Sequence, residues 1–203
     1  MKIGIIDFGI GNTRSISNVL NREGISNEIL YKPKDLVGID KIILPGVGSF
    51  DPAVRGLKSS GFGSKILEKV SQGAHLLGIC LGAQLLYQNS EEGDLEGLGL
   101  INGAVSQFEQ SEIFKVPHMG WNTITIEKDN PLLRNISSGE RFYFAHSYFI
   151  RNENDEHSVA KTKYNLEFDA IVNKNNVSGV QFHPEKSHAQ GIKILLNFAS
   201  QRV

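Results

Sequence analysis

Hydrophobic positions in the first half of the chain form short blocks of two kinds. Mostly apolar runs, typical of strands buried on both faces, cover residues 3–7, 41–44 and 76–79, and a further short strand is expected at 26–30. Segments whose apolar residues have helical spacing cover residues 13–23, 52–59, 63–72 and 81–87. Because strands alternate with helices, this half predicts a parallel sheet flanked by helices.

The second half has a different pattern, with short runs in which apolar and polar residues alternate. These runs predict strands at 104–108, 123–127, 141–145, 158–162, 168–172 and 177–182. A last helix is expected at 189–201, with Ile192, Leu195, Leu196 and Ala199 on its buried face. No linker, repeat or low-complexity tract divides the chain, so we expect one α/β domain over residues 1–203. Its central sheet should be mostly parallel, with extra antiparallel strands from the second half.

Composition narrows the possible partners and location. The 203 residues carry a net charge of −1, which gives no electrostatic reason to expect nucleic acid or an anionic membrane as a partner. A single cysteine excludes an internal disulfide and is typical of a reducing compartment. The first residues lack the apolar core of a signal peptide, and no apolar run is long enough to span a bilayer. We therefore expect a cytoplasmic protein.

The single cysteine, Cys80, lies where the apolar run 76–79 changes to helical spacing. Gly78 and Gly82 flank it, and small neighbours allow the chain to turn sharply between strand and helix. A helix N-terminus behind the sulfur favours thiolate over thiol. The alternative is an ordinary buried core cysteine. A core cysteine needs neither glycine, so the pattern favours a catalytic nucleophile.

A thiol nucleophile needs a base, and the base needs a group that orients it. His183 follows the last expected strand, and Pro184 confines it to an extended conformation. Residues two apart in extended chain point to the same side, so Glu185 can reach the His183 ring. The alternative is a strand-end histidine beside a surface glutamate. A zinc site at these residues is disfavoured because no fourth ligand is adjacent, so no metal is expected.

Two glycine-containing turns follow the first and third apolar runs. Gly9-x-Gly11 lacks the third glycine of a dinucleotide-binding loop, because position 14 is Arg; we interpret it as a tight turn in which Asn12 caps a helix or faces a partner. The loop 45–49 can turn backbone N–H groups toward an anion, with Ser49 as a helix cap. The acidic segment 91–96 is interpreted as a solvated turn. Outside His183, no histidine has a comparable setting.

Five motifs, in this order, carry a resemblance to a known family. They are Gly-Ile-Cys-Leu-Gly-Ala-Gln at 78–84, residues 117–122, residues 143–148, residues 179–187 and, within this last stretch, His-Pro-Glu at 183–185. The chain resembles the class I, or triad, glutamine amidotransferases, and among them the glutaminase subunits of imidazole glycerol phosphate synthase in histidine biosynthesis. The resemblance implies a flavodoxin-like fold and hydrolysis of L-glutamine to glutamate and ammonia, without a cofactor.

The resemblance also implies residue roles at the reacting centre. The Cys80 thiolate attacks the glutamine amide, His183 transfers protons, and Glu185 orients His183. The oxyanion is expected to bind the Leu81 N–H and one N–H from Val47–Gly48.

Further roles concern substrate and partner. Gln84, Gly48, Ser147 and Tyr148 are expected to bind the substrate glutamine. Three residues are expected to face a (β/α)8-barrel cyclase or synthase subunit in a heterodimer that receives the ammonia: Asn12, Trp121 and Lys186. For Trp121 the alternative is a core or surface aromatic residue.

Departures from the family pattern leave the acceptor open. Ala83 replaces a frequent methionine, Asn102 stands where proline is common, and Asn165 begins a segment without the usual glycine. The alternatives are a paralogous subunit that supplies ammonia for amidine formation on a surface sugar, a standalone cysteine amide hydrolase, and a non-catalytic binding module. If loop 45–49 has two orientations similar in energy, the chain alone is expected to be a poor glutaminase.

Overall fold

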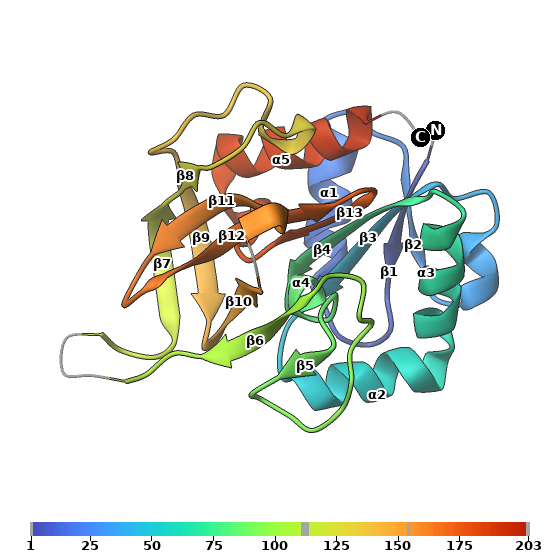
Figure 1. Cartoon of the computed structure of the whole chain (residues 1–203). Coiled ribbons are helices and arrows are strands. Elements are labelled where there is room, and N and C mark those ends of the chain that lie inside the picture. The colour runs from blue at the N-terminus through green and yellow to red at the C-terminus, as the bar shows by residue number, and fades with distance from the viewer. Residues whose placement is uncertain (1, 111–113, 154, 202–203) are drawn as a thin grey trace.

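Eight strands form the central sheet of the computed structural model, in which residues 2–110, 114–153 and 155–201 are described (Figure 1). Their order across the sheet is β2-β1-β3-β4-β13-β12-β11-β8. The first five are parallel, and the remaining three continue the sheet in antiparallel pairs. These strands are β1 (Ile3–Ile6), β2 (Asn27–Leu30), β3 (Lys41–Gly46), β4 (His75–Cys80), β8 (Thr125–Ile126), β11 (Ser158–Lys163), β12 (Glu167–Lys174) and β13 (Val177–Val180).

Two smaller sheets and five α-helices complete the fold. One small sheet has the order β10-β6-β5, and the other is the antiparallel pair β7-β9. Their strands are β5 (Asn89–Ser90), β6 (Gly103–Gln107), β7 (His118–Thr123), β9 (Arg141–His146) and β10 (Tyr148–Asn152). The helices are α1 (Thr13–Arg22), α2 (Phe50–Ser60), α3 (Phe62–Ser71), α4 (Leu81–Gln84) and α5 (His188–Ser200). Short 3-10 helices are η1 (Pro33–Leu36), η2 (Pro131–Leu133), η3 (Asp155–His157) and η4 (Pro184–Lys186).

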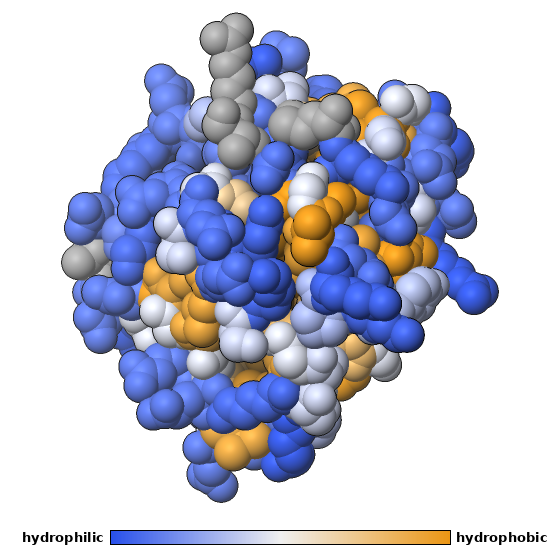
Figure 2. Space-filling model, turned by 90° about the vertical axis from the view of Figure 1, so that its right-hand side faces the viewer, coloured by the Kyte–Doolittle hydropathy of each residue, from blue (hydrophilic) through white to orange (hydrophobic). Residues whose placement is uncertain are grey.

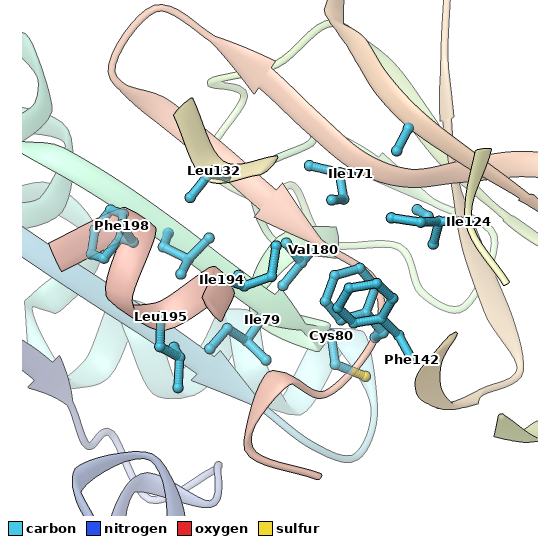
Figure 3. Close-up of a cluster of buried hydrophobic side chains, with 14 of the residues drawn as sticks. Ile79, Cys80, Ile124, Leu132, Phe142, Ile171, Val180, Ile194, Leu195 and Phe198 are labelled. Carbon is cyan, nitrogen blue, oxygen red and sulfur yellow. The ribbon is translucent and has the colours of Figure 1, made fainter. Parts of the chain in front are cut away.

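The inner parallel strands β1, β3, β4 and β13 are buried on both faces, whereas the edge strand β2 is only partly buried. Neighbouring residues of β4 point to opposite sides, so that Leu77 and Ile79 join one core while Leu76 joins the other. The first core packs against α1 and α5, and it continues to Cys80 at the end of β4 (Figure 3). The second core packs against α2 and α3. The nucleophile candidate therefore stands at the margin of a well-packed core.

The second half agrees with the expected strands less well than the first. The segment expected as one strand at 123–127 is largely wrong: β7 ends at Thr123 and only the short β8 follows. Neither β7, which has Gly120 near its centre, nor β10, one residue after β9, was expected. The helix expected at 81–87 ends at Gln84, and a tighter turn then buries Tyr87, whose hydroxyl donates to Asn152 Oδ1 at 2.7 Å.

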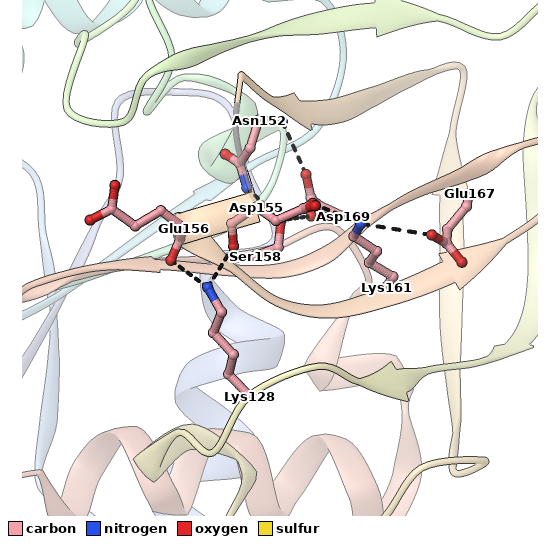
Figure 4. Close-up of polar contacts among 8 residues, drawn as sticks. All are labelled: Lys128, Asn152, Asp155, Glu156, Ser158, Lys161, Glu167 and Asp169. Carbon is pink, nitrogen blue, oxygen red and sulfur yellow. Dashed lines mark hydrogen bonds and ion pairs between the residues drawn. The ribbon is translucent and has the colours of Figure 1, made fainter.

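A polar cluster joins β10, β11 and β12 (Figure 4). The buried carboxylate of Asp169 accepts a hydrogen bond from Ser158 Oγ at 2.5 Å and one from the Asn152 N–H at 3.0 Å. Burial raises the pKa of Asp169, and these hydrogen bonds oppose the increase. Lys161 lies 2.8 Å from Asp155 and 3.7 Å from Glu167, which adds ion pairs at the surface. The cluster joins β10, which begins at Tyr148, to β11 and β12.

Figure 2 shows the side of the molecule formed by α2 and α3, where hydrophobic residues make separate patches in a mostly hydrophilic surface. An apolar hollow on this side has Val54, Leu57, Leu67 and Leu98 in its wall. In the described part of the chain, none of the helices combines the length and apolar character that a membrane crossing requires.

Candidate active site

Cys80 stands on a strained turn between β4 and α4. Its backbone has φ 54° and ψ −112°, a conformation that side chains rarely adopt. A Cβ added to Gly82 would lie 1.8 Å from the Leu44 carbonyl oxygen, and one added to Gly78 would lie 2.6 Å from the Gly82 oxygen. Both flanking glycines are therefore required by close backbone contacts, as the sequence predicted. Cys80 has only 6% of its surface exposed, and its Sγ lies 3.9 Å from the Ala145 carbonyl oxygen.

Parallel pairing places His183 beside the cysteine. Val180, in β13, pairs with Ile79 in β4, so that the chain leaving β13 runs past Cys80. The backbone of His183 is fixed by a hydrogen bond from its N–H to the Tyr143 carbonyl at 2.9 Å. Its carbonyl accepts a bond from Ser187 Oγ at 2.6 Å, and the same hydroxyl accepts from the Tyr143 N–H at 3.0 Å. Strand β9 and helix α5 thus both hold this histidine in place.

Glu185 orients the ring, as the spacing of the two residues predicted. His183 Nδ1 donates to Glu185 Oε1 at 2.9 Å, and the two side chains are 4% and 2% exposed. This bond leaves the other ring nitrogen for Cys80. Burial alone lowers the pKa of His183, but its hydrogen bonds to Cys80 and Glu185 prevail and raise the pKa to about 10. The ring is therefore an imidazolium at neutral pH, with Glu185 and Cys80 as its hydrogen-bond partners.

A pocket of about 220 Å³ opens over the cysteine and collects the residues expected to contact the substrate. Eight of the residues in its wall were singled out from the sequence: Val47, Gly48, Cys80, Leu81, Gln84, Ser147, Tyr148 and His183. Gly48 has φ +100°, which is compatible with an anion-binding turn of the backbone. Gln84 Nε2 donates to the Tyr148 carbonyl at 2.8 Å, so the helix residue and β10 are joined across the pocket.

The residues expected at a partner surface lie outside the residues that line this pocket. Asn12 caps α1, with its side chain accepting from the Ser15 N–H at 3.4 Å. Trp121 is 37% exposed and stacks on His188, with ring centroids 5.0 Å apart and planes at 6°. Lys186 is exposed, and its Nζ lies 5.7 Å from the centre of the Tyr143 ring.

Glu92 was missed, because the acidic segment was interpreted as a solvated turn; that interpretation is wrong for this residue. Glu92 lines the pocket, and its Oε2 accepts a hydrogen bond from the Phe50 N–H at 3.0 Å. Glu92 therefore caps α2, in the place expected for Ser49, which makes no such side-chain bond to the helix backbone. Burial raises the pKa of Glu92, although bonds from Phe50 and Ser49 oppose the increase. Its position 42 residues after Phe50 left no local pattern that could reveal it.

Two further histidines were also missed. His146 lines the pocket, and His118 lies behind it. The distance from His118 Nδ1 to His146 Nε2 is 3.1 Å. Both residues are buried. The one signal in the sequence was their presence in two of the five motifs. Among the described residues, no group of three or more histidine, cysteine, aspartate or glutamate side chains is arranged to hold a metal ion.

Comparison with known proteins places this site in a family. The family model described as glutamine amidotransferase class I matches residues 4–201. The chain is 46% identical, over 98% of its length and 99% of the relative's, to imidazole glycerol phosphate synthase subunit HisH 2 of Methanococcus maripaludis. It is 46% identical, over 98% of its length and 96% of the relative's, to subunit HisH of a Geobacillus species.

A solved structure has the same fold: a crystal structure of a glutamine amidotransferase superimposes with a TM-score of 0.76 at 19% identity, covering 98% of this chain and 99% of the other. The elbow at Cys80, the neighbouring His183 and Glu185 and these likenesses agree with one another. The chain therefore belongs to the class I glutamine amidotransferases and, within them, to the imidazole glycerol phosphate synthase subunits HisH.

Proposed function

We propose that residues 1–203 act as one glutamine amidotransferase domain that hydrolyses L-glutamine and supplies the ammonia to the synthase reaction of histidine biosynthesis. The observation that carries the proposal is the buried arrangement of Cys80, His183 and Glu185 at the C-terminal end of β4. His183 Nδ1 lies 2.9 Å from Glu185 Oε1, and its bond to Cys80 raises the histidine pKa. This is the arrangement of nucleophile, base and orienting group that acyl transfer requires.

The reaction proceeds in two halves at this triad. The Cys80 thiolate adds to the side-chain amide carbon of glutamine, and imidazolium His183 gives its proton to the departing ammonia. The product of this half is a γ-glutamyl thioester. Neutral His183 then takes a proton from water, which attacks the thioester carbonyl and releases glutamate and the thiolate. Glu185 stabilises the imidazolium whenever it forms.

The oxyanion of each tetrahedral intermediate needs two donors. The Leu81 N–H, at the N-terminus of α4, is one of them. The loop N–H groups of Val47 or Gly48 supply the other, since both residues line the same pocket. The α4 N-terminus therefore favours negative charge on both the thiolate and the intermediate.

The rest of the pocket fits the amino-acid part of glutamine. Among the described residues that line it, Glu92 carries the one carboxylate, which suits the α-ammonium group of the substrate. Gln84, Ser147 and Tyr148 offer hydrogen-bonding groups around it. The α-ammonium nitrogen of glutamine is four bonds from the side-chain amide carbon. Holding this charged group at Glu92 would place the amide carbon at the sulfur, which favours glutamine over a peptide substrate.

The partner is proposed to be a (β/α)8-barrel cyclase or synthase subunit, which forms a heterodimer with this chain. Its docking face includes Asn12, Trp121 and Lys186. Trp121 and Met119 support this placement because β7 exposes 37% of the first and 65% of the second beside the pocket. Large exposed apolar side chains of this kind are enriched at interfaces.

The test is to co-purify the chain with its native synthase and to assay glutamate release with candidate ammonia acceptors. The proposal expects the histidine-pathway acceptor to be converted with glutamine as nitrogen donor. Turnover of a surface-sugar acceptor in its place would assign the chain to the paralogous amidine-forming reaction. Good hydrolysis of esters or peptides without hydrolysis of glutamine would favour a standalone amide hydrolase.

A further inference from the structure

His118 and His146 have no part in the proposed chemistry, although His146 lines the pocket and His118 lies directly behind it. They face each other in the antiparallel pair β7-β9, where His118 is opposite His146. His118 is 3% exposed and His146 is 5% exposed. A hydrogen bond between two buried histidines needs a donor nitrogen on one ring and an acceptor nitrogen on the other. The direction of each hydrogen bond can therefore be worked out from the neighbouring groups.

The Tyr148 carbonyl determines the first proton. A carbonyl oxygen only accepts, so His146 Nδ1, at 2.8 Å from it, carries a hydrogen. Burial lowers the pKa of His146 to about 3, so its Nε2 carries none and must accept. The donor is His118 Nδ1, at 3.1 Å. Burial likewise lowers the pKa of His118 to about 4, which makes its Nε2 an acceptor for Asn122 Nδ2 at 3.3 Å.

The asparagine at the start of this chain of bonds is fixed in orientation. Asn122 Nδ2 also donates to the Lys163 carbonyl at 2.9 Å, and Asn122 Oδ1 accepts from the Thr123 N–H at 2.9 Å. An amide flip would place the Asn122 oxygen against the Lys163 carbonyl oxygen and the Asn122 NH2 group against the Thr123 N–H. All three hydrogen bonds therefore donate in the same direction: Asn122 to His118, His118 to His146, and His146 to the Tyr148 carbonyl. We call this chain of hydrogen bonds the relay.

Aromatic rings enclose the pair and keep it neutral. His118 stacks between Phe144, at 4.9 Å between centroids, and Tyr164, at 4.2 Å. Phe168 meets His146 edge to face at 5.3 Å, and Phe108 contacts both histidines. Neither histidine forms an ion pair with a carboxylate of a described residue. After burial, charge on His118 and then on His183 opposes protonation of His146.

The relay ends on a group of the pocket. The Tyr148 carbonyl that accepts from His146 also accepts from Gln84 Nε2 at 2.8 Å. Its position therefore decides where the Gln84 amide and the Ser147–Tyr148 segment stand. The start of the relay lies in β7, the strand that exposes Met119 and Trp121.

We propose that His118 and His146 are positioning residues: the relay from Asn122 to the Tyr148 carbonyl holds the substrate-binding wall of the pocket in register with Cys80. The inference rests on the proposed glutaminase function for its effect on catalysis, while the relay itself can be read without activity. It acts through ground-state binding, so its loss raises KM more than it lowers kcat.

Nitrogen-15 NMR of histidine-labelled protein reads the relay directly. Both residues are expected as the neutral Nδ1–H tautomer, with no titration between pH 5 and 8. Assignments come from the His118→Phe and His146→Asn proteins. A neutral Nε2–H form at either residue, or a charge change in this pH range in folded protein, would overturn the relay.

Two variants of His146 separate its hydrogen bonds from its bulk. His146→Asn keeps an N–H donor as many bonds from the backbone as Nδ1, whereas His146→Leu has none. Expected values, with the native partner and acceptor present, are a KM for glutamine within about threefold of the native protein's for His146→Asn and raised about tenfold for His146→Leu. In both, kcat should change by less than about threefold. Equal KM values in the two variants would reject the positioning role.

A distant variant tests transmission along the relay. Asn122→Leu removes the first donor outside the pocket and should raise KM about threefold. Asn165→Leu is the matched control, since it loses a bond to the Glu109 carbonyl without touching either histidine, and its KM should be unchanged. Equal effects of the two would contradict the relay.

One reading is independent of activity. The side-chain amide protons of Gln84 should give a single ordered pair of NMR signals in native and His146→Asn proteins and averaged signals in His146→Leu. Unchanged Gln84 signals in folded His146→Leu would overturn the inference. If instead the native complex released no glutamate while these spectra behaved as expected, the proposed function would fall and the relay would stand.

Discussion

His183 and the pair His118–His146 occupy the same end of the sheet and are buried almost equally, yet their pKa values move in opposite directions. His183 is 3% exposed, and its pKa rises to about 10 because its bonds to Cys80 and Glu185 outweigh burial. His118 and His146 are 3% and 5% exposed, and burial lowers their pKa values to about 4 and about 3. Partners, and not burial, decide which histidine is charged.

The two settings also differ in how the fold builds them. His183 leaves a parallel strand that pairs with the strand of Cys80, so their proximity follows from the order of the sheet. His118 and His146 meet because β7 and β9 form a separate antiparallel pair. A charged, chemically active ring thus stands on the sheet, and a neutral, positioning pair stands on a small ribbon beside it.

The largest expected effect comes from removing the sulfur. Cys80→Ala should lower glutamate release by about 10⁴-fold or more, because the nucleophile is lost while little core volume changes. The pKa of His183 should fall, which would bring this value closer to the pKa values of His118 and His146. Glutamate release is measured with partner and acceptor present.

Ammonium salt serves as the control in this experiment, since the synthase reaction should continue when ammonia is supplied directly. Substantial glutaminase activity in folded Cys80→Ala protein would exclude the proposed nucleophile.

Removing the charge of the orienting carboxylate should have the next largest effect. Glu185→Gln retains the size of the side chain but no longer stabilises the imidazolium, so kcat should fall by roughly 10³-fold. Its Oε2 has no hydrogen-bond partner among the described groups, so an amide N–H placed there gains none. Glu96→Gln is the matched control, because Glu96 is exposed and accepts only from Gln88. Similar rates in the two variants would separate Glu185 from the reaction.

The parallel half of the molecule could be predicted from sequence because its signals are local. Each run buried on both faces is continuous, and Gly78 and Gly82 mark the elbow next to Cys80. The spacing of His183 and Glu185 gave their contact, since two residues apart in extended chain share a side. The parallel half of the fold and the contact between His183 and Glu185 could therefore be predicted from local patterns.

The remaining parts of the site depend on contacts distant in sequence. Glu92 reaches the pocket because it caps α2 at Phe50, 42 positions earlier. His118 and His146 are 28 positions apart and pair through strands with weak alternation. A glutamate in an acidic loop and a histidine in a short strand also occur at many surface positions in proteins, so local spacing cannot identify them as site residues.

Partner binding should produce a smaller change, through loop 45–49. Gly48 has φ +100° and lies in open space, which gives this loop backbone freedom, so the oxyanion N–H need not face the pocket in the free chain. One oxyanion donor is worth roughly 3–4 kcal/mol, so partner plus acceptor should raise kcat a few hundredfold with a smaller change in KM. Glutamate release is compared for the chain alone, with partner, and with both. Full activity in the isolated chain would contradict the gating and favour a standalone hydrolase.

The smallest effects are on stability, and they separate the two kinds of histidine by pH. A histidine whose folded pKa is raised stabilises the fold fully below its unfolded pKa of about 6.5, and the contribution is lost as pH rises toward the folded value. For His183 that loss extends from about pH 6.5 to about 10. Glu185→Gln should reduce this loss of stability between about pH 6.5 and 10.

His118 and His146 affect stability at acidic pH instead, because their folded pKa values are lowered to about 4 and about 3. Below about pH 6.5 the unfolded chain binds protons that the folded chain does not, so stability falls on acidification. Each neutral histidine accounts for about 2 kcal/mol between pH 6.5 and 5. His118→Phe retains the stacking on Phe144 and Tyr164 but does not titrate, so its urea midpoint should fall less over this range than the midpoint of His157→Gln, which changes a histidine outside the relay. Equal acid sensitivity in the two proteins would mean that His118 is protonated in the folded state, and the contrast with His183 would disappear.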